Sequence, residues 1–318
     1  MPVIIPQELP ARAVLESENV FVMTEARAGH QDIRPLRIAI LNLMPTKINT
    51  ETQLLRLLGS TPLQVDITLL RMGSHDSRNT SPEHLDAFYA TVDDVRDQRF
   101  DGLVVTGAPV ERLPFEDVDY WAELRDLMDW SVDHAFSCLY VCWGAQAALY
   151  HHYGVPKHPL DGKIAGVFPH RLVDPRPQVV TGFDEVFTAP HSRYTEVRAE
   201  DVEAADGLAL LAVSDEAGVY LVASTDGRRV FVTGHPEYDR HTLRAEYQRD
   251  AVTEAEPVLP LHYFPDDDPA REPGMSWRSH AYLLYANWLN YAVYQRTPFS
   301  LDVLPQSPPA TGSTRVPR

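Results

Sequence analysis

The segment 139–147 reads Leu-Tyr-Val-Cys-Trp-Gly-Ala-Gln-Ala and constrains the fold of this chain more than any other segment. An apolar run leads directly into Cys142-x-Gly144-x-Gln146 and then into residues typical of a helix. This order predicts a sharp strand-to-helix turn with the cysteine at its tip, a nucleophile elbow. The dipole of the following helix favours a thiolate, and free N–H groups of the turn bind an oxyanion. We therefore expect Cys142 to be a nucleophile and the backbone N–H of Trp143 to contribute to an oxyanion hole.

A second motif supplies a base for this thiol. His235 follows the apolar run 230–232, and Glu237 lies two residues further on. A carboxylate at this spacing orients the imidazole, and an oriented imidazole activates a cysteine for attack on a carbonyl. The combination predicts acyl transfer through a cysteine thioester. Cys138 lies on the same apolar run outside the motif and is expected to be an inert buried thiol.

Composition excludes several classes of protein. With 318 residues, 44% of them hydrophobic and 23% charged, the chain is long enough to bury a full core. Its formal charge of −17 argues against binding to nucleic acid or to anionic membranes, because both need a basic surface. It has two cysteines, too few for a disulfide framework, and no stretch of about 18 apolar residues. The amino terminus lacks a basic leader, so we expect a reducing, cytoplasmic location.

Hydrophobic patterning predicts an α/β fold with a mostly parallel, doubly wound sheet and helices on both faces. A capping box, Thr50-x-x-Gln53, is expected to open a helix that Gly59 ends. A proline-rich stretch, 156–190, follows the elbow helix, and no strand is predicted within it. The remaining predicted strands are 36–44, 65–69, 102–106, 208–214, 219–224 and 230–233, and the remaining helices are 117–134, 240–256 and 276–294.

The helix 276–294 carries apolar and aromatic residues nearly all round. It is expected to be buried, either against the rest of the chain or against a second copy in a homodimer. Residues 266–273 are acidic and proline-containing and are expected to form a solvated loop. The parallel order of the sheet places ligands at the carboxyl ends of its strands, where Cys142, His235 and the loop after Thr106 all fall.

Beyond the elbow, an ordered series of motifs resembles a known family. Cys-x-Gly-x-Gln with a distant His-Pro-Glu is similar to the class I glutamine amidotransferase core, whose sheet is flavodoxin-like. The full series resembles the homoserine O-succinyltransferase/O-acetyltransferase family over residues 2–299. The motifs are Asn42-Leu-Met-Pro-Thr-Lys47, Thr106-Gly-Ala-Pro-Val-Glu111, Val141-Cys-Trp-Gly-Ala-Gln146, Asp161-Gly-Lys163, Pro190-His-Ser-Arg-Tyr194 and Gly234-His-Pro-Glu237. The resemblance implies an N-terminal family-specific segment, 1–35, and an acyltransferase domain, 36–299; the residues 300–318 lack apolar periodicity and are expected to be disordered.

The resemblance also assigns roles to individual residues. It implies that Cys142 carries the acyl thioester, that His235 is the general base and that Glu237 is its partner. It further implies three substrate-binding residues, namely Lys163, Ser192 and Arg249. A guanidinium suits the carboxylate of an amino-acid substrate, and His235 must deprotonate a substrate hydroxyl. Without the resemblance, these three would be interpreted as solvated helix or loop residues.

Two further positions bear on the acyl donor. The residue matching Glu111 is glycine in family members that use succinyl-CoA and glutamate in those that use acetyl-CoA. A glutamate would repel the succinyl carboxylate, so Glu111 implies acetyl-CoA. Lys47 is interpreted either as a site residue that contacts coenzyme A phosphate or as a solvated lysine.

The resemblance therefore implies a homoserine O-acetyltransferase of methionine biosynthesis that works by ping-pong chemistry. Acetyl-CoA and L-homoserine are the expected small-molecule substrates, with no permanently bound cofactor and no metal; the adjacent His151 and His152 do not make a zinc site by themselves. One alternative is a succinyltransferase on the same scaffold. Another is a glutaminase-type amidotransferase, which would need a partner because no phosphate loop is present. A ligand-sensing module is the non-enzymatic alternative, but it would be expected to lack part of the Cys142, His235 and Glu237 set.

Overall fold

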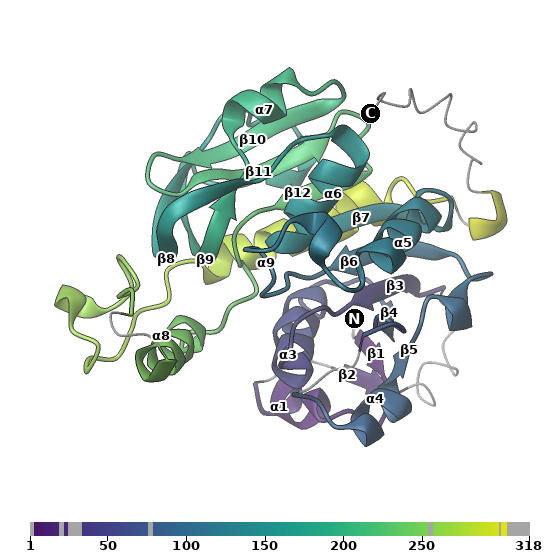
Figure 1. The fold of residues 1–318 in the computed structure, drawn as a ribbon. Helices are drawn as coiled ribbons and strands as arrows, with labels where there is room; N and C mark the ends of the chain where they lie inside the picture. Colours follow the sequence, from purple (N-terminus) through teal and green to yellow (C-terminus); the bar gives the residue numbers. More distant parts are fainter. Residues whose placement is uncertain are drawn as a thin grey trace.

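The computed structural model describes residues 3–18, 22–24, 34–75, 79–253, 257–298 and 300–303. These residues form a 12-stranded sheet with the order β2-β1-β4-β3-β6-β7-β12-β11-β10-β8-β9, and β5 pairs with β4. Figure 1 shows the sheet with its helices on both sides. The strands are β1 Val3–Ile5, β2 Val22–Thr24, β3 Leu36–Leu41, β4 Val65–Leu70, β5 Tyr89–Ala90, β6 Phe100–Val105, β7 Ala135–Val141, β8 His158–Leu172, β9 Val186–Glu196, β10 Leu208–Ser214, β11 Gly218–Ser224 and β12 Arg229–Val232.

The sheet has a parallel part and an antiparallel part. Strands β1 to β7 and β12 pair in parallel, whereas β11, β10, β8 and β9 continue the sheet in antiparallel order. The change of direction occurs at β12, which pairs in parallel with β7 and antiparallel with β11. The predicted α/β class and the mostly parallel, doubly wound sheet are confirmed.

Two helical layers cover the sheet, and alternate residues of the central strands face each layer. Val104 and Leu139 pack into the core under α1, α3 and α9, while Leu103 and Tyr140 pack into the core under α5 and α6. This alternation follows from the period of two along a strand. The helices are α1 Ala11–Ser17, α3 Lys47–Leu58, α4 Pro82–Phe88, α5 Trp121–His134, α6 Trp143–Tyr153, α7 Ala199–Ala204, α8 Thr242–Thr253 and α9 Arg278–Asn287, which continues as a π-helical segment, Trp288–Tyr294.

The helix predicted at 276–294 is buried inside the chain itself. The indole of Trp288 donates to the Ser137 hydroxyl at 2.9 Å. A Cβ atom added to Gly102 would lie 2.8 Å from the Trp288 ring, so the strand approaches the helix as closely as glycine allows. Trp288 and Tyr285 are therefore covered by the same chain, whereas Tyr282 and Tyr291 are only partly buried, and the homodimer stays a prediction.

Two sequence predictions were wrong. Helix α3 begins at Lys47 rather than at Thr50, and its N-cap, Thr46, makes no side-chain cap bond; the predicted end at Gly59 is confirmed. The proline-rich stretch forms most of a long antiparallel hairpin, β8 and β9, in which Pro159, Pro169 and Pro190 are paired residues. Pro190 is tolerated because it lies on β9, the edge strand of the sheet. Pro159 and Pro169 lie on β8 outside Arg171 and Leu172, the two residues that pair with β10, so each needs to pair on one side only.

The rest of the predicted elements lie close to their expected positions. The strands predicted at 208–214, 219–224 and 230–233 match β10, β11 and β12 within one residue. The predicted helix 240–256 is observed as α8, and residues 254–256 and the tail 304–318 lie outside the described residues. In the part of the chain that is described, no helix is both long enough and apolar enough to span a membrane.

Candidate active site

Cys142 lies on a strained turn between β7 and α6. Its backbone has φ 51° and ψ −118°, and α6 begins at the next residue, Trp143. A positive φ is unfavourable for a residue with a side chain, so the surrounding structure must hold it in place. The Cys142 N–H donates to the Val232 carbonyl at 2.7 Å, which links the elbow to β12. The predicted elbow is confirmed. Because Trp143 is the first residue of α6, its backbone N–H has no hydrogen-bond acceptor within the helix.

Two glycines allow the elbow to approach β6. A Cβ atom on Gly144 would lie 2.5 Å from the Thr106 carbonyl oxygen, which explains glycine in the Cys-x-Gly motif. A Cβ atom on Gly107 would lie 3.1 Å from Cys142 Cβ and 3.5 Å from His235 Cε1. Gly107 is therefore in the site, although sequence reasoning did not single it out. Gly107 follows the buried strand β6, which is next to β7 in the sheet, and this position is the sequence signal that identifies it.

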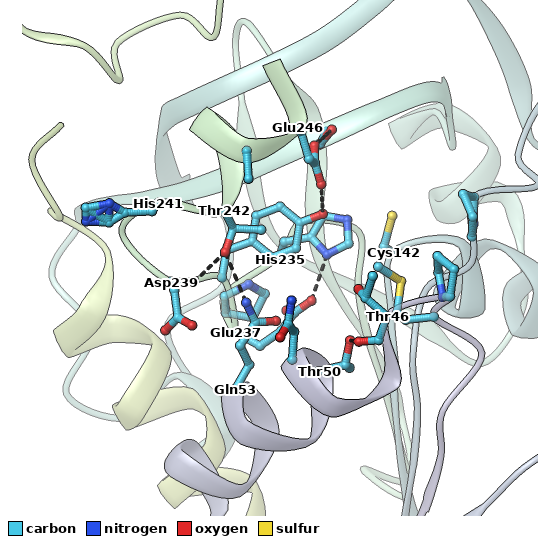
Figure 2. Close-up of a pocket in the computed structure, with 18 of the residues that line it drawn as sticks. Thr46, Thr50, Gln53, Cys142, His235, Glu237, Asp239, His241, Thr242 and Glu246 are labelled. Carbon is cyan, nitrogen blue, oxygen red and sulfur yellow. Dashed lines mark hydrogen bonds and ion pairs between the residues drawn. The ribbon is translucent and has the colours of Figure 1, made fainter. Parts of the chain in front are cut away.

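His235 follows β12 and is held on three sides. Its Nδ1 lies 2.7 Å from Glu237 Oε1, and only 4% and 7% of the two side chains are exposed. The backbone N–H of His235 donates to the Pro190 carbonyl, and the imidazole ring stacks on the Tyr238 ring, with 4.1 Å between the ring centroids. Figure 2 shows His235 between Cys142 and Glu237. The predicted order of thiol, imidazole and carboxylate is present in space.

The electrostatics of this group favour a charged imidazole. Burial lowers the pKa of His235, but the negative charges of Cys142 and Glu237 outweigh burial, and the pKa is raised well above its ordinary value. An imidazolium beside a cysteine stabilises the thiolate, which is the nucleophilic form. The group is therefore suited to nucleophilic attack without a further base.

Strands β7 and β12 both end at one cavity of about 1390 Å³, which Cys142 and His235 line. This volume exceeds what an amino acid needs and is large enough for a second, bulkier ligand. The cavity brings together most of the residues predicted from the sequence. They are Glu111, Cys142, Lys163, Ser192, His235, Glu237 and Arg249.

One corner of the cavity is rich in charge; we call the group Lys163, Ser192, Glu246, Arg249 and Asp250 the charged corner. Asp250 accepts from Lys163 Nζ at 2.7 Å and from Arg249 Nη2 at 2.7 Å. Ser192 donates to Glu246. Burial raises the pKa of Asp250, but the bonds from Lys163 and Arg249 outweigh it, and the pKa is lowered.

Glu246 and Asp250 were not predicted as site residues. On α8, Glu246 lies three residues before Arg249 and four before Asp250, and these two spacings place Glu246 beside both residues on the helix surface. Helix α8 lies beyond the ends of β8 and β9 (Figure 1), and Lys163 and Ser192 come from these two strands. The helical spacing around Arg249 is the sequence signal that identifies both acids.

Glu111 lies in the loop after β6 and lines the cavity. Lys157, which sequence reasoning missed, donates from Nζ to the Glu111 carbonyl at 2.7 Å and to the Leu113 carbonyl. Burial lowers the pKa of Lys157 to about 8, although Glu111 and Glu116 raise it in part. Lys157 therefore fixes the loop that carries Glu111.

Lys47 is neither solvated nor directed into the cavity. Its side chain is buried, and Nζ donates to the carbonyls of Asn42 and Met44. Burial lowers its pKa to about 8, against the raising effect of Glu51. The interpretation as a solvated lysine is wrong. Lys47 instead holds the loop whose residues Met44 and Pro45 line the cavity.

No cluster of three or more His, Cys, Asp or Glu side chains in the described part of the chain is placed to hold a metal ion. His151 lies beside Asp129 at 2.7 Å, and burial lowers the pKa of His152 to about 3.

The fold and the elbow define the class of protein. The structure is similar to a glutamine amidotransferase from Thermotoga maritima, with a TM-score of 0.53, 10% identity and coverage of 82% of this chain and 99% of that one. It is also similar to a glutamine amidotransferase from Methylobacillus flagellatus, with a TM-score of 0.51, 16% identity and coverage of 81% and 95%. This likeness shows a class I glutamine amidotransferase-like fold.

Sequence comparison narrows the class to a family. The chain belongs to the homoserine O-succinyltransferase family, whose model matches residues 2–299. It is 59% identical to a homoserine O-acetyltransferase of Acetivibrio thermocellus over 96% of this chain and 100% of that protein. It is 60% identical to a homoserine O-acetyltransferase of Desulfovibrio desulfuricans over 96% and 98%.

Proposed function

We propose that this chain is a homoserine O-acetyltransferase that transfers acetyl from acetyl-CoA to the hydroxyl of L-homoserine. The observation that carries the proposal is the placement of Cys142, His235 and Glu237 at the ends of two adjacent parallel strands, facing one cavity. Nearly full-length similarity to proteins of that name supports the choice of reaction. The site has the nucleophile, base and orienting carboxylate that acyl transfer needs.

The first half-reaction loads the enzyme. His235 takes the thiol proton of Cys142, and the thiolate attacks the carbonyl carbon of acetyl-CoA. The oxyanion that forms is stabilised by the N–H of Trp143 at the positive end of α6. The bond from carbon to the coenzyme A sulfur then breaks, His235 returns the proton to that sulfur, and acetyl remains on Cys142 as a thioester.

The second half-reaction unloads the enzyme. The homoserine hydroxyl gives its proton to His235, and its oxygen attacks the thioester carbonyl. The bond from carbon to Cys142 sulfur breaks, which regenerates the thiolate and releases O-acetylhomoserine. Glu237 keeps the imidazole oriented and stabilises its positive charge in both halves. The lysine and arginine of the charged corner bind the homoserine carboxylate.

The proposed reaction implies a metabolic pathway and a cellular compartment for the enzyme. Activation of the homoserine hydroxyl belongs to methionine biosynthesis, and we propose that this occurs in the cytoplasm. Support comes from the chemistry of the site, since Cys142 must stay reduced to act and both Cys138 and Cys142 are free thiols.

The direct test is incubation of the pure protein with L-homoserine and either acetyl-CoA or succinyl-CoA, followed by measurement of free coenzyme A thiol and of the ester product. We expect O-acetylhomoserine with acetyl-CoA and much slower reaction with succinyl-CoA. A preference for succinyl-CoA would change the donor but leave the cysteine mechanism intact. Release of ammonia from glutamine without ester formation would contradict the proposal.

Substitution of Glu111 should change the acyl donor. Glu111→Gly removes a charge and a volume that oppose the succinyl carboxylate, so the ratio of kcat/KM values should move toward succinyl-CoA by at least about 10-fold. Glu111→Gln keeps the volume and separates the two causes. Glu83→Gln, at an exposed glutamate of α4 outside the cavity, is the matched control. An unchanged donor ratio in Glu111→Gly would show that residue 111 does not contact the acyl group.

Substitution of Arg249 should weaken binding of homoserine. Arg249→Ala removes a cation from the charged corner, so the KM for homoserine should rise by at least about 10-fold with a smaller change in kcat. Steady-state kinetics at saturating acetyl-CoA measures both constants. Arg125→Ala, an exposed arginine of α5, should leave both constants unchanged. An unchanged KM in Arg249→Ala would remove Arg249 from the acceptor site.

A further inference from the structure

The Glu246 carboxylate lies at the edge of the proposed acceptor site and can accept further hydrogen bonds. Its Oε1 accepts from the Tyr238 hydroxyl at 2.7 Å, and its Oε2 accepts from the Ser192 hydroxyl. Both donors are neutral. The cation of Lys163 lies 3.9 Å from Oε2 but only 2.7 Å from Asp250, so its short contact is to Asp250. Each carboxylate oxygen has two lone pairs, so Glu246 can still accept bonds from an incoming donor.

The charges of the charged corner are arranged as two neighbouring poles. Lys163 and Arg249 share one carboxylate, Asp250, so these three side chains carry one net positive charge. Glu246 places one negative charge beside them. The side chains of Glu246 and Lys163 are only 16% and 8% exposed, so solvent screens this pattern less than it would at the surface.

An α-amino acid has the complementary pattern, because its ammonium and carboxylate are attached to the same carbon. The cationic pole suits the carboxylate. The ammonium needs an acceptor a few ångströms away, and a charged acceptor gives the strongest hydrogen bonds. We propose that Glu246 binds the ammonium group of homoserine and makes the enzyme select an α-amino acid over a simple hydroxy acid. This inference rests on the proposed function for the identity of the acceptor.

The tyrosine that donates to Glu246 also contacts the proposed base, His235. Tyr238 donates to Glu246 and stacks on the ring of His235 with an angle of 18° between the planes. Figure 2 shows Glu246 and His235 among the residues that line the cavity, and Tyr238 contacts both of them. An amino acid bound at Glu246 is therefore held beside the imidazole that must deprotonate its hydroxyl. Orientation of this kind raises the rate as well as the affinity.

The experiment uses enzyme that has been acetylated with acetyl-CoA and freed of coenzyme A. Acetyl transfer is then measured to L-homoserine and to 4-hydroxybutyrate, which lacks only the amino group. The wild type should prefer homoserine by at least about 10³-fold, because the analogue cannot make the charge-assisted hydrogen bond to Glu246. Glu246→Gln keeps the volume and removes the charge, and it should reduce this preference by at least about 30-fold.

Three comparisons make the test specific. Glu246→Asp retains the charge and should keep more of the preference than Glu246→Gln. Gln248→Ala, exposed on the same helix and outside the cavity, should keep the full preference. Formation of the acetyl-enzyme by a variant shows that the variant is folded. If Glu246→Gln forms no acetyl-enzyme, the test uses Glu246→Asp instead. The preference of Glu246→Asp for homoserine should be lower than that of the wild type by at least about 3-fold.

The outcomes separate this inference from the proposed function. A wild type that forms the acetyl-enzyme but transfers acetyl to neither acceptor would contradict homoserine as the acceptor. A wild type that acetylates homoserine, together with Glu246→Gln and Glu246→Asp variants that keep its full preference over 4-hydroxybutyrate, would contradict the ammonium assignment alone. A rise in KM that is equal for both acceptors would likewise assign Glu246 to a structural role.

Discussion

Incubation with acetyl-CoA alone should leave one acetyl group on Cys142. The thioester should accumulate because the second half-reaction needs the acceptor hydroxyl, and intact-mass measurement followed by peptide mapping detects it. Cys142→Ala should lose both the label and at least about 10⁴-fold in turnover, since no other group at the elbow can replace the thiol. The strained backbone at this position supports the same nucleophile.

The second cysteine of the chain provides the control. Cys138 is buried on β7, with its sulfur 3.8 Å from the Ser131 hydroxyl, and it does not line the cavity. Cys138→Ala should therefore keep the acetyl label and the turnover. Label on Cys138, or turnover without any acetyl-enzyme, would refute the assignment of Cys142.

Loss of the base should have the next largest effect. His235→Ala should lower kcat by at least about 10²-fold, because the imidazole takes the proton from both nucleophiles. Glu237→Gln keeps the volume but removes the charge that orients and stabilises the imidazolium, and it should lower kcat by at least about 10-fold. Steady-state kinetics and thermal unfolding of each variant separate a catalytic loss from a folding defect.

The raised pKa of His235 adds a dependence on pH. A raised pKa means that the imidazole stays protonated at neutral and mildly acidic pH, where it favours the thiolate of Cys142. Alkylation of Cys142 by iodoacetamide at pH 6 should therefore be at least about 10-fold slower in His235→Ala than in the wild type.

A surface pair of the same type serves as the control for both measurements. His75 Nδ1 lies 2.8 Å from Asp119 Oδ2, with both side chains well exposed. His75→Ala should leave kcat and the alkylation rate unchanged. Equal alkylation rates in His235→Ala and the wild type would show that the imidazole does not activate the thiol.

Sequence reasoning located the proposed reacting groups because they depend on local patterns. The elbow needs an apolar strand, a cysteine directly after it and a glycine two residues further on, and all of these are local in the chain. The pairing of Cys142 with His235 followed from a second rule, that the carboxyl ends of parallel strands meet at one edge of the sheet. The observed register, with Val141 opposite Val232, satisfies that rule.

The missed elements depend on contacts that local patterns do not contain. The long hairpin β8 and β9 contains prolines that argue against a strand, yet they are tolerated because each lies where its strand pairs on one side only. Helix α3 begins before its apparent capping box because tertiary packing, rather than a side-chain cap, fixes its first turn. From its charge, Lys47 was expected to contact coenzyme A phosphate at the site or to be solvated, whereas the loop between β3 and α3 folds its backbone carbonyls around the ammonium group.

The sequence by itself determined the chemistry of the site: a cysteine at an elbow, a histidine at the end of a strand and a glutamate to orient it. Only the tertiary structure decided how the acceptor site is charged. Lys163 and Asp250 come from a strand and a helix far apart in the chain, and so do Ser192 and Glu246. The physical reason is that a hydrogen bond or ion pair depends on distance in space, and the sheet and α8 set that distance after the chain has folded.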